Sequence, residues 1–258
     1  MHGWVRQVVV GLSALAMVGV NGWTSVSGPG VREVSDRYFN ALTPANYAFA
    51  IWGPIFLGAL ALSLYQALPA QRNSRRLDTL GWPLTVSYLA TALWPLAFLD
   101  GQLGLSLLLM VLMLLGLATC YVRATDAAAL PGQPRPPAFD WLVRLPTALF
   151  FGWITAATFV NTALWLLRRG VSELGGLSNE LWAAALLLVA AGVGAFIVRR
   201  SKEVAYGLVL IWAAWGIVAA HPGAGVTQMA AIVLTAAILA VSVWSLMTPR
   251  VEAERRPA

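Results

Sequence analysis

Charged and metal-binding side chains are scarce in this chain. Only 11% of its 258 residues are charged and 59% are hydrophobic, whereas a soluble domain has about a quarter charged residues. The composition therefore predicts an integral membrane protein. The single Cys120 lies in an apolar run, which excludes a disulfide framework and a cysteine metal cluster. His2 and His221 lie in a terminus and a predicted loop, so they form no metal site or catalytic constellation by themselves.

Long apolar runs are what the chain has instead. A run of about 17–25 apolar residues can cross a bilayer as a helix, and we find eight. Polar, glycine- or proline-containing stretches such as PAQRNSRRLD and LPGQPRPP separate them. The sequence therefore predicts an all-α membrane protein in contact with the lipid bilayer. The expected spans are about 4–22, 46–67, 80–99, 103–122, 142–167, 181–198, 204–220 and 227–247, the seventh being the shortest.

The basic residues are distributed unevenly between the two sides of this predicted topology. Thirteen of the 17 Lys and Arg residues fall on the side that holds both termini, and four fall on the other side. The positive-inside rule then places both termini in the cytoplasm, and the arginine- and alanine-rich composition favours a bacterial inner membrane. The pI near 10.1 follows from this topology, so we expect no nucleic-acid partner. As an alternative, the first run resembles a signal peptide, but no small-x-small cleavage site follows it and cleavage would leave seven spans.

Tryptophan is abundant, with twelve residues in the chain. Seven lie near span ends, where the aromatic belt of membrane proteins explains them: Trp4, Trp23, Trp82, Trp141, Trp165, Trp182 and Trp244. Five lie further inside their spans, where helix packing and ligand contact are both open: Trp52, Trp94, Trp153, Trp212 and Trp215.

One stripe of the fifth span combines aromatic, small and polar side chains. Trp153, Ala157 and Asn161 follow one another at intervals of four, so they share a helix face. Trp52 and Trp94 lie toward the outer ends of the second and third spans, and Ala157 leaves room between the aromatic groups. This pattern is typical of a pocket that stacks a flat apolar molecule with a polar edge.

The second and third spans, and the loop before the second, contain two further signals. Pro54 and Pro95 closely follow Trp52 and Trp94, and each removes a backbone donor and tends to kink its helix. The longest outer loop, TSVSGPGVREVSDRYFNALTPAN, precedes the second span and is positioned to cover the outer half of the bundle. A solvated connector is the alternative interpretation of this loop.

Three segments, in order, resemble the tryptophan-rich sensory protein / translocator protein family (TspO/MBR). They are PANYAFAIWGPIF, SYLATALWPLAFLDGQLGLSLLLM and WITAATFVNTALW. Thr43 stands where the family has the second proline of a pair, and the third span lacks the family's Asn. The positions in register with the family pattern are Pro44, Trp52, Ile55, Phe56, Trp94, Phe98, Trp153, Ala157, Asn161 and Trp165.

The resemblance implies a five-helix bundle over residues 1–168, and three additional spans with a short tail over 169–258. It also implies a cavity, covered by the first loop, that binds a porphyrin or haem-type tetrapyrrole, a sterol or a similar flat molecule. The alanine that matches Ala157 lies against the ligand in this family. The expected ligand-binding residues are Tyr38, Tyr47, Phe49, Trp52, Phe56, Trp94, Phe98, Trp153, Ala157 and Asn161. A homodimer remains an open alternative to a monomer.

Three functions compete for this sequence. A receptor or carrier for a flat hydrophobic ligand agrees best with the aromatic spans. An intramembrane enzyme needs groups that exchange protons or attack a substrate, and we expect no catalytic or metal-binding residue, because Asp100 is better explained as a solvated turn residue. Oxidative chemistry on a bound porphyrin is an alternative, since it needs no acid–base pair. An ion-coupled transporter would carry carboxylates inside its spans, and these spans lack them. For Trp212 and Trp215 a structural role is favoured over a pocket or a subunit contact.

Overall fold

The chain folds into a bundle of long helices. The computed structural model describes residues 2–28, 31, 33–34, 40–125, 136–171, 176–223 and 225–248, and within these it contains no strand. The prediction of an all-α membrane protein is therefore confirmed. The long helices are α1 (Gly3–Val26), α3 (Trp52–Ala67), α4 (Arg75–Leu99), α5 (Leu103–Thr125), α7 (Leu145–Arg168), α8 (Asn179–Ser201), α9 (Val204–Ala220) and α10 (Gly225–Met247).

The number of helices agrees with the predicted spans. Among the described residues, seven helical segments are long and apolar enough to cross a membrane by length and composition. The eighth, α9, is apolar but has only 17 residues, which is at the lower limit of about 17 for a span. It corresponds to the predicted span that was shortest.

Short irregular helices precede two of the long ones. The 3-10 helix η1 (Asn46–Ile51) leads into α3, so Pro54 lies in the first turn of α3, where a missing N–H costs little. The turn α6 (Pro137–Phe139) and the π-helix η3 (Asp140–Arg144) lead into α7, which has Pro146 in its first turn. A proline inside a helix remains at Pro95 in α4, as the sequence predicted. The 3-residue 3-10 turn η2 (Pro69–Gln71) joins α3 to α4.

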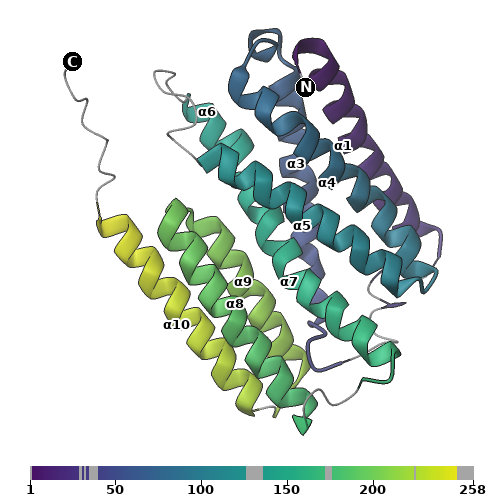
Figure 1. Cartoon of the computed structure of the whole chain (residues 1–258), viewed down its shortest axis with the longest axis vertical. Coiled ribbons are helices and arrows are strands. Elements are labelled where there is room, and N and C mark those ends of the chain that lie inside the picture. Colours follow the sequence, from purple (N-terminus) through teal and green to yellow (C-terminus); the bar gives the residue numbers. More distant parts are fainter. Residues whose placement is uncertain are drawn as a thin grey trace.

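The helices form two groups that lie side by side. Figure 1 shows α1, α3, α4, α5 and α7 in one group and α8, α9 and α10 in the other. Within the first group, α7 is the helix that faces the second group. Among the last three helices, α9 makes the main contact with α7. This contact is close because Gly152 has no side chain: a Cβ there would lie 2.9 Å from the carbonyl oxygen of Tyr206.

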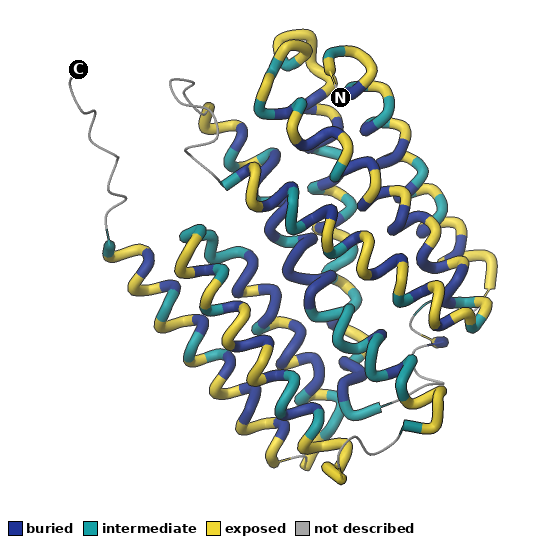
Figure 2. Tube along the Cα trace, in the orientation of Figure 1, coloured by how far each residue is buried: buried dark blue, intermediate teal, exposed yellow. Residues whose placement is uncertain are grey.

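Burial follows the same arrangement. Figure 2 shows buried residues along the inner faces of the helices and exposed residues along the outer faces. Large apolar side chains in the middle of a helix, such as Leu57 and Leu64, are 70% and 72% exposed. A soluble protein rarely exposes apolar surface on this scale, so these faces suit contact with lipid.

A buried arginine joins three helices at the end of the bundle where the chain begins. Arg6 of α1 is 1% exposed. Its guanidinium donates to Asp78 Oδ1 at 2.5 Å in α4, to Gln66 Oε1 at 3.2 Å in α3, and to the carbonyl oxygen of Gln71 at 2.5 Å. A buried charge is tolerated only when it is paired in this way.

A second buried arginine joins the two groups of helices at the same end. Arg144 of η3 is 6% exposed and forms ion pairs with Asp140 at 2.7 Å and with Glu203 at 3.1 Å, just before α9. The hydroxyls of Tyr121 and Ser201 are hydrogen bonded at 2.5 Å nearby, between α5 and α8. Polar contacts thus fix the terminal end of the bundle.

Candidate ligand-binding pocket

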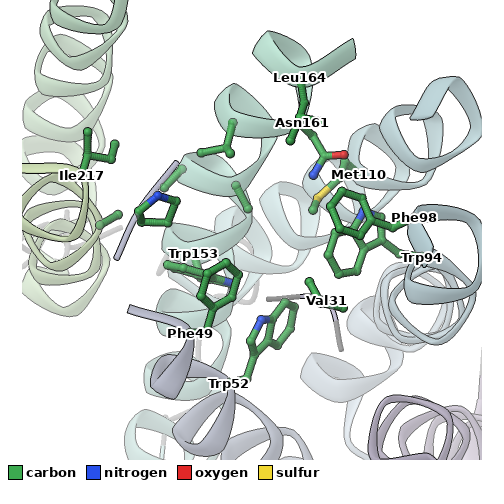
Figure 3. Close-up of a pocket in the computed structure, with 15 residues that line it drawn as sticks. Val31, Phe49, Trp52, Trp94, Phe98, Met110, Trp153, Asn161, Leu164 and Ile217 are labelled. Atoms are coloured by element: carbon green, nitrogen blue, oxygen red, sulfur yellow. The ribbon is translucent and has the colours of Figure 1, made fainter. Parts of the chain in front are cut away.

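An aromatic cavity lies in the half of the bundle away from the termini. It has a volume of about 50 Å³, and side chains from α4, α5, α7, α9 and the start of α3 surround it (Figure 3). We call it the aromatic pocket. Its lining residues are Val31, Pro44, Phe49, Trp52, Trp94, Phe98, Met110, Trp153, Ala156, Ala157, Val160, Asn161, Leu164, Ala213 and Ile217.

Seven of the ten residues expected from the sequence line this pocket. They come from three segments that are far apart in the chain, and the fold brings them to one place: Phe49, Trp52, Trp94, Phe98, Trp153, Ala157 and Asn161. Their role in ligand binding stays a prediction.

Trp52 is the centre of the aromatic wall. Its ring lies 6.5 Å from that of Trp94, with 28° between the planes, and 6.2 Å from that of Trp153 at 81°. Phe98 stacks on Trp94 at 4.9 Å, and Phe49 meets Trp153 edge-on at 6.1 Å. Offset-stacked and edge-to-face pairs at such distances are favourable, so the wall holds its rings in fixed orientations.

Two indole N–H groups in this wall have no hydrogen-bond partner among the described residues. Trp94 and Trp153 are 4% and 3% exposed, and the Nε1 atom of each is buried and unpartnered. Leaving a buried donor unsatisfied costs about 1–3 kcal/mol. Both residues line the pocket, so two unsatisfied donors belong to its wall.

Asn161 adds a positioned amide. Its side chain is buried, and its Oδ1 accepts a hydrogen bond from the hydroxyl of Ser106 in α5 at 2.8 Å. With Oδ1 engaged, the NH₂ group is the part of the amide that can donate to a ligand. Figure 3 shows the amide on the same side of the pocket as Trp94 and Phe98. The positioning role of Ser106 was not predicted from the sequence.

The stripe on α7 has the arrangement that its spacing predicted. Trp153 and Asn161 are buried, and Ala157 lies between them on the pocket wall and is half-buried. A larger side chain at this position would occupy space that the cavity now holds. The small residue therefore helps to keep the pocket open.

Two expected residues do not line the pocket, and a third cannot be compared with it. Tyr47 is 45% exposed and packs edge-on against Trp212 at 5.2 Å. Phe56 stacks on Trp52 at 5.3 Å and supports that ring without lining the cavity. Tyr38 lies outside the described residues. Helix register explains Phe56, because it follows Trp52 by one turn and continues the same stripe past the cavity.

The sequence analysis missed the contribution of α9. Ala213 and Ile217 of this helix line the pocket, and so does Met110 of α5. Alanine, isoleucine and methionine are common in any membrane helix, so no signal in the sequence marked them. Trp212 and Trp215, the conspicuous residues of α9, make packing contacts instead, because their indole groups donate to Ala48 and Thr235. The structural role favoured for them agrees with these contacts.

Helix α9 also holds the segment that covers the pocket. We call residues 43–51 the cover segment, since Pro44 and Phe49 contribute to the lining. The backbone N–H of Ala45 donates to the carbonyl oxygen of Gly216 at 2.8 Å, and the indole N–H of Trp212 donates to that of Ala48 at 3.0 Å.

Close contact accompanies these hydrogen bonds. A Cβ on Gly216 would lie 2.9 Å from the Cβ of Ala48 and 3.2 Å from that of Pro44, so only glycine permits this approach. The Nε2 atom of His221, just after α9, lies 3.2 Å from the carbonyl oxygen of Thr43. The cover segment is therefore fixed to α9 and the residue after it at its start and in its middle.

These features define a class: a multi-pass α-helical membrane protein with an aromatic cavity between its helices. A family profile described as "TSPO-like protein" matches residues 7–247. The chain therefore belongs to the TSPO-like protein family, and the resemblance to the TspO/MBR family is confirmed. The match extends over α8, α9 and α10, beyond the segments that carried the resemblance. Comparisons with curated proteins and with solved structures returned no significant match.

Proposed function

We propose that this protein is a membrane receptor or carrier that binds a flat hydrophobic ligand in the aromatic pocket. The ligand class is a porphyrin or similar tetrapyrrole, a sterol, or another flat molecule with hydrogen-bond acceptors on one edge. The location that we propose is the bacterial inner membrane, with the termini in the cytoplasm and the pocket in the outer half of the bilayer. The division into a five-helix unit over 1–168 and three further helices over 169–258 remains part of this proposal.

The pair of unpartnered indole donors carries the proposal. Trp94 and Trp153 place two buried N–H groups in a wall that is otherwise apolar, and the NH₂ of Asn161 is a third donor on the same cavity. An acceptor-bearing ligand would satisfy groups that no described residue satisfies. The stacked rings around Trp52 would contact its flat face.

The size of the pocket sets a requirement for binding. Its volume is about 50 Å³, whereas pockets for drug-sized ligands begin at roughly 300 Å³. A tetrapyrrole therefore needs lining groups to move apart. The pocket wall on α9 consists of the aliphatic side chains of Ala213 and Ile217, which can move more easily than the packed rings on the other side.

The lining favours binding over acid–base chemistry. Among its described residues there is no carboxylate, imidazole, thiol or amine, and the described part of the chain holds no cluster of three potential metal ligands. General acid–base and nucleophilic catalysis require such groups. Oxidative chemistry on a bound porphyrin would need no such group, and it stays the alternative function.

A titration with protoporphyrin IX tests the proposal. Changing Trp153 to Leu removes one ring and one donor, so we expect the dissociation constant to rise about 30-fold, equivalent to ~2 kcal/mol. The change to Phe keeps a ring and loses only the donor, and should cost about fivefold. Trp82, which is 61% exposed, supplies the matched control, and Trp82→Leu should alter affinity less than twofold.

Affinity has to be measured by equilibrium partition as well as by fluorescence, because energy transfer quenches tryptophans that do not touch the porphyrin. Cholesterol added as a competitor distinguishes a sterol ligand from a tetrapyrrole. Equal effects of the Trp82 and Trp153 changes would refute the assignment of the pocket. Failure of the purified protein to bind either molecule would refute the proposed ligand class.

A further inference from the structure

Two more cavities lie between α7 and the last three helices. The larger has a volume of about 250 Å³ and lies among the end of α7, the start of α8 and residues 40–42. We call it the side chamber. It is lined by Asn40, Ala41, Leu42, Thr162, Ala163, Leu166, Leu167, Val171, Asn179, Trp182, Ala183 and Leu186.

The smaller cavity lies between the side chamber and the aromatic pocket. It has a volume of about 30 Å³, and we call it the neck. Four residues line both the neck and the aromatic pocket: Ala156, Val160, Ala213 and Ile217. Two residues, Leu42 and Leu186, line both the neck and the side chamber. The three cavities therefore form a row in which each shares part of its wall with the next.

We propose that this row is the route by which ligand reaches the aromatic pocket, with the side chamber as an entry site. The inference rests on the proposed function, since it concerns the ligand of the same pocket. It assigns a role to α8 and α9: together with α7 they form the walls of the route. The chemical class that fits is a molecule with an apolar body and a polar end.

The barriers along the row are side chains. Leu42 and Leu186 separate the chamber from the neck, and Ile217 and Val160 stand between the neck and the pocket. Side chains change rotamer on fast timescales without breaking backbone contacts. The cover segment, in contrast, is held to α9 by the hydrogen bonds of Ala45 and Ala48. Opening the row therefore requires fewer contacts to break than lifting the cover segment.

The composition of the walls agrees with this role. The neck is lined on the α8 and α9 sides by small residues, among them Ala190 and Ala214, which leave room when the larger side chains rotate. The side chamber exceeds the ~150 Å³ of an apolar cavity that accepts benzene. Its wall also contains the polar side chains of Thr162 and Asn179, which can bond the polar end of a ligand while its apolar part enters the neck.

Thiol accessibility tests the route without depending on any ligand. In a Cys120→Ala background, Ala157→Cys places one thiol on the pocket wall, and methyl methanethiosulfonate reports how fast a small molecule reaches it. Ala190 lines the neck and does not line the pocket, so Ala190→Leu should narrow only the route. We expect the modification rate to fall at least tenfold, with a smaller fall for Ala190→Val.

The matched control is the next residue on the same helix. Ala191 is 5% exposed, like Ala190 at 6%, and lines none of the three cavities. Ala191→Leu adds the same volume to the helix and should change the rate less than twofold. The route would be overturned if both variants slowed modification equally or if neither slowed it. It would also be overturned if the thiol of the Cys120→Ala/Ala157→Cys protein stayed unmodified.

Protoporphyrin IX kinetics separate this inference from the proposed function. With a route through the neck, Ala190→Leu slows association and dissociation by similar factors and leaves the dissociation constant within twofold. An altered dissociation constant, with the two rates changed by different factors, would overturn the route and make the neck part of the binding site. If the parent protein binds no porphyrin, the proposed ligand fails, and the thiol measurement still decides whether the route exists.

Discussion

The two ends of the helix bundle differ in what surrounds their buried polar groups. At the end that holds the termini, the two buried arginines have charged partners: Arg6 bonds Asp78, and Arg144 bonds Glu203. At the other end, Trp94 and Trp153 bury indole donors that have no partner among the described residues. Buried atoms without a partner occur at both ends, since Arg144 Nε and Ser245 Oγ also lack one, but Trp94 and Trp153 line the aromatic pocket and those two residues do not.

This difference suggests different roles for the two ends of the bundle. Satisfied buried charges fix the positions of helices, because removing one partner leaves the other stranded. Unsatisfied donors lower stability, and beside a cavity they agree with the ligand that we propose. The comparison therefore assigns the terminal end to anchoring and the aromatic end to recognition. The following predictions test that assignment.

The largest expected effect concerns which end faces the cytoplasm. The basic residues of the described helix ends gather at the terminal end, as in Arg75, Arg123, Arg199 and Arg200, whereas Arg168 is at the other end. The positive-inside rule predicts that a reporter fused after residue 258 is active only in the cytoplasm. Paired alkaline phosphatase and green fluorescent protein fusions give an all-or-none result. A phosphatase-active fusion would reverse the two ends and place the pocket toward the cytoplasm.

The second prediction breaks the anchoring end. Arg6→Met keeps much of the apolar side chain but leaves Asp78 without its buried partner, so the free energy of unfolding should fall by about 3 kcal/mol. Chemical denaturation in detergent measures the loss. Arg123→Met is the control, because Arg123 donates only to an exposed carbonyl group and should cost under ~1 kcal/mol.

The same Arg6 variant also tests the separation of the two ends. Its folded fraction should bind protoporphyrin IX with unchanged affinity, because the aromatic pocket lies in the other half of the bundle. A large loss of affinity in protein that is still folded would show that the ends are coupled and would contradict the assignment.

Much of the fold could be predicted from the sequence, for a simple physical reason. In hydrocarbon every backbone polar group has to be hydrogen bonded within the chain. A long apolar run such as 103–122 therefore forms a helix. The helix α5 covers that run and extends it to Thr125. The 3-10 helix η1 and the π-helix η3 were not predicted, because such local changes depend on packing between distant segments.

The candidate site was predictable only where its residues are chemically distinctive. Trp153, Ala157 and Asn161 share a face of one helix, and periodicity alone revealed them. Ala213 and Ile217 are indistinguishable in the sequence from residues that face lipid. Their place in the pocket depends on how α9 packs against α7, which is set by contacts such as Gly152 with Tyr206. Such a crossing between distant helices leaves no periodic signal.

The third prediction fills the recognition end. Ala157→Leu adds three carbon atoms to the wall of a cavity of about 50 Å³, so the dissociation constant for protoporphyrin IX should rise about tenfold. The thermal midpoint should change little, since the added volume enters a void. Ala195→Leu, at a half-buried position of α8 away from all three cavities, is the control. Normal binding together with a destabilised bundle would identify Ala157 as a helix-packing contact.

The smallest expected effect concerns the cover segment, which belongs to the recognition end but is anchored by hydrogen bonds. Gly216→Ala places a Cβ 2.9 Å from that of Ala48, so the cover segment has to shift by a few tenths of an ångström. Phe49 would then contact the ligand less closely, and we expect the dissociation constant for protoporphyrin IX to rise about threefold. The double variant Gly216→Ala/Ala48→Gly removes the opposing Cβ and should restore affinity. Gly192→Ala, which meets nothing within 4 Å, should leave affinity unchanged. If Gly216→Ala binds as tightly as the parent protein, the cover segment takes no part in recognition, and its hydrogen bonds to α9 belong with the anchoring contacts at the opposite end.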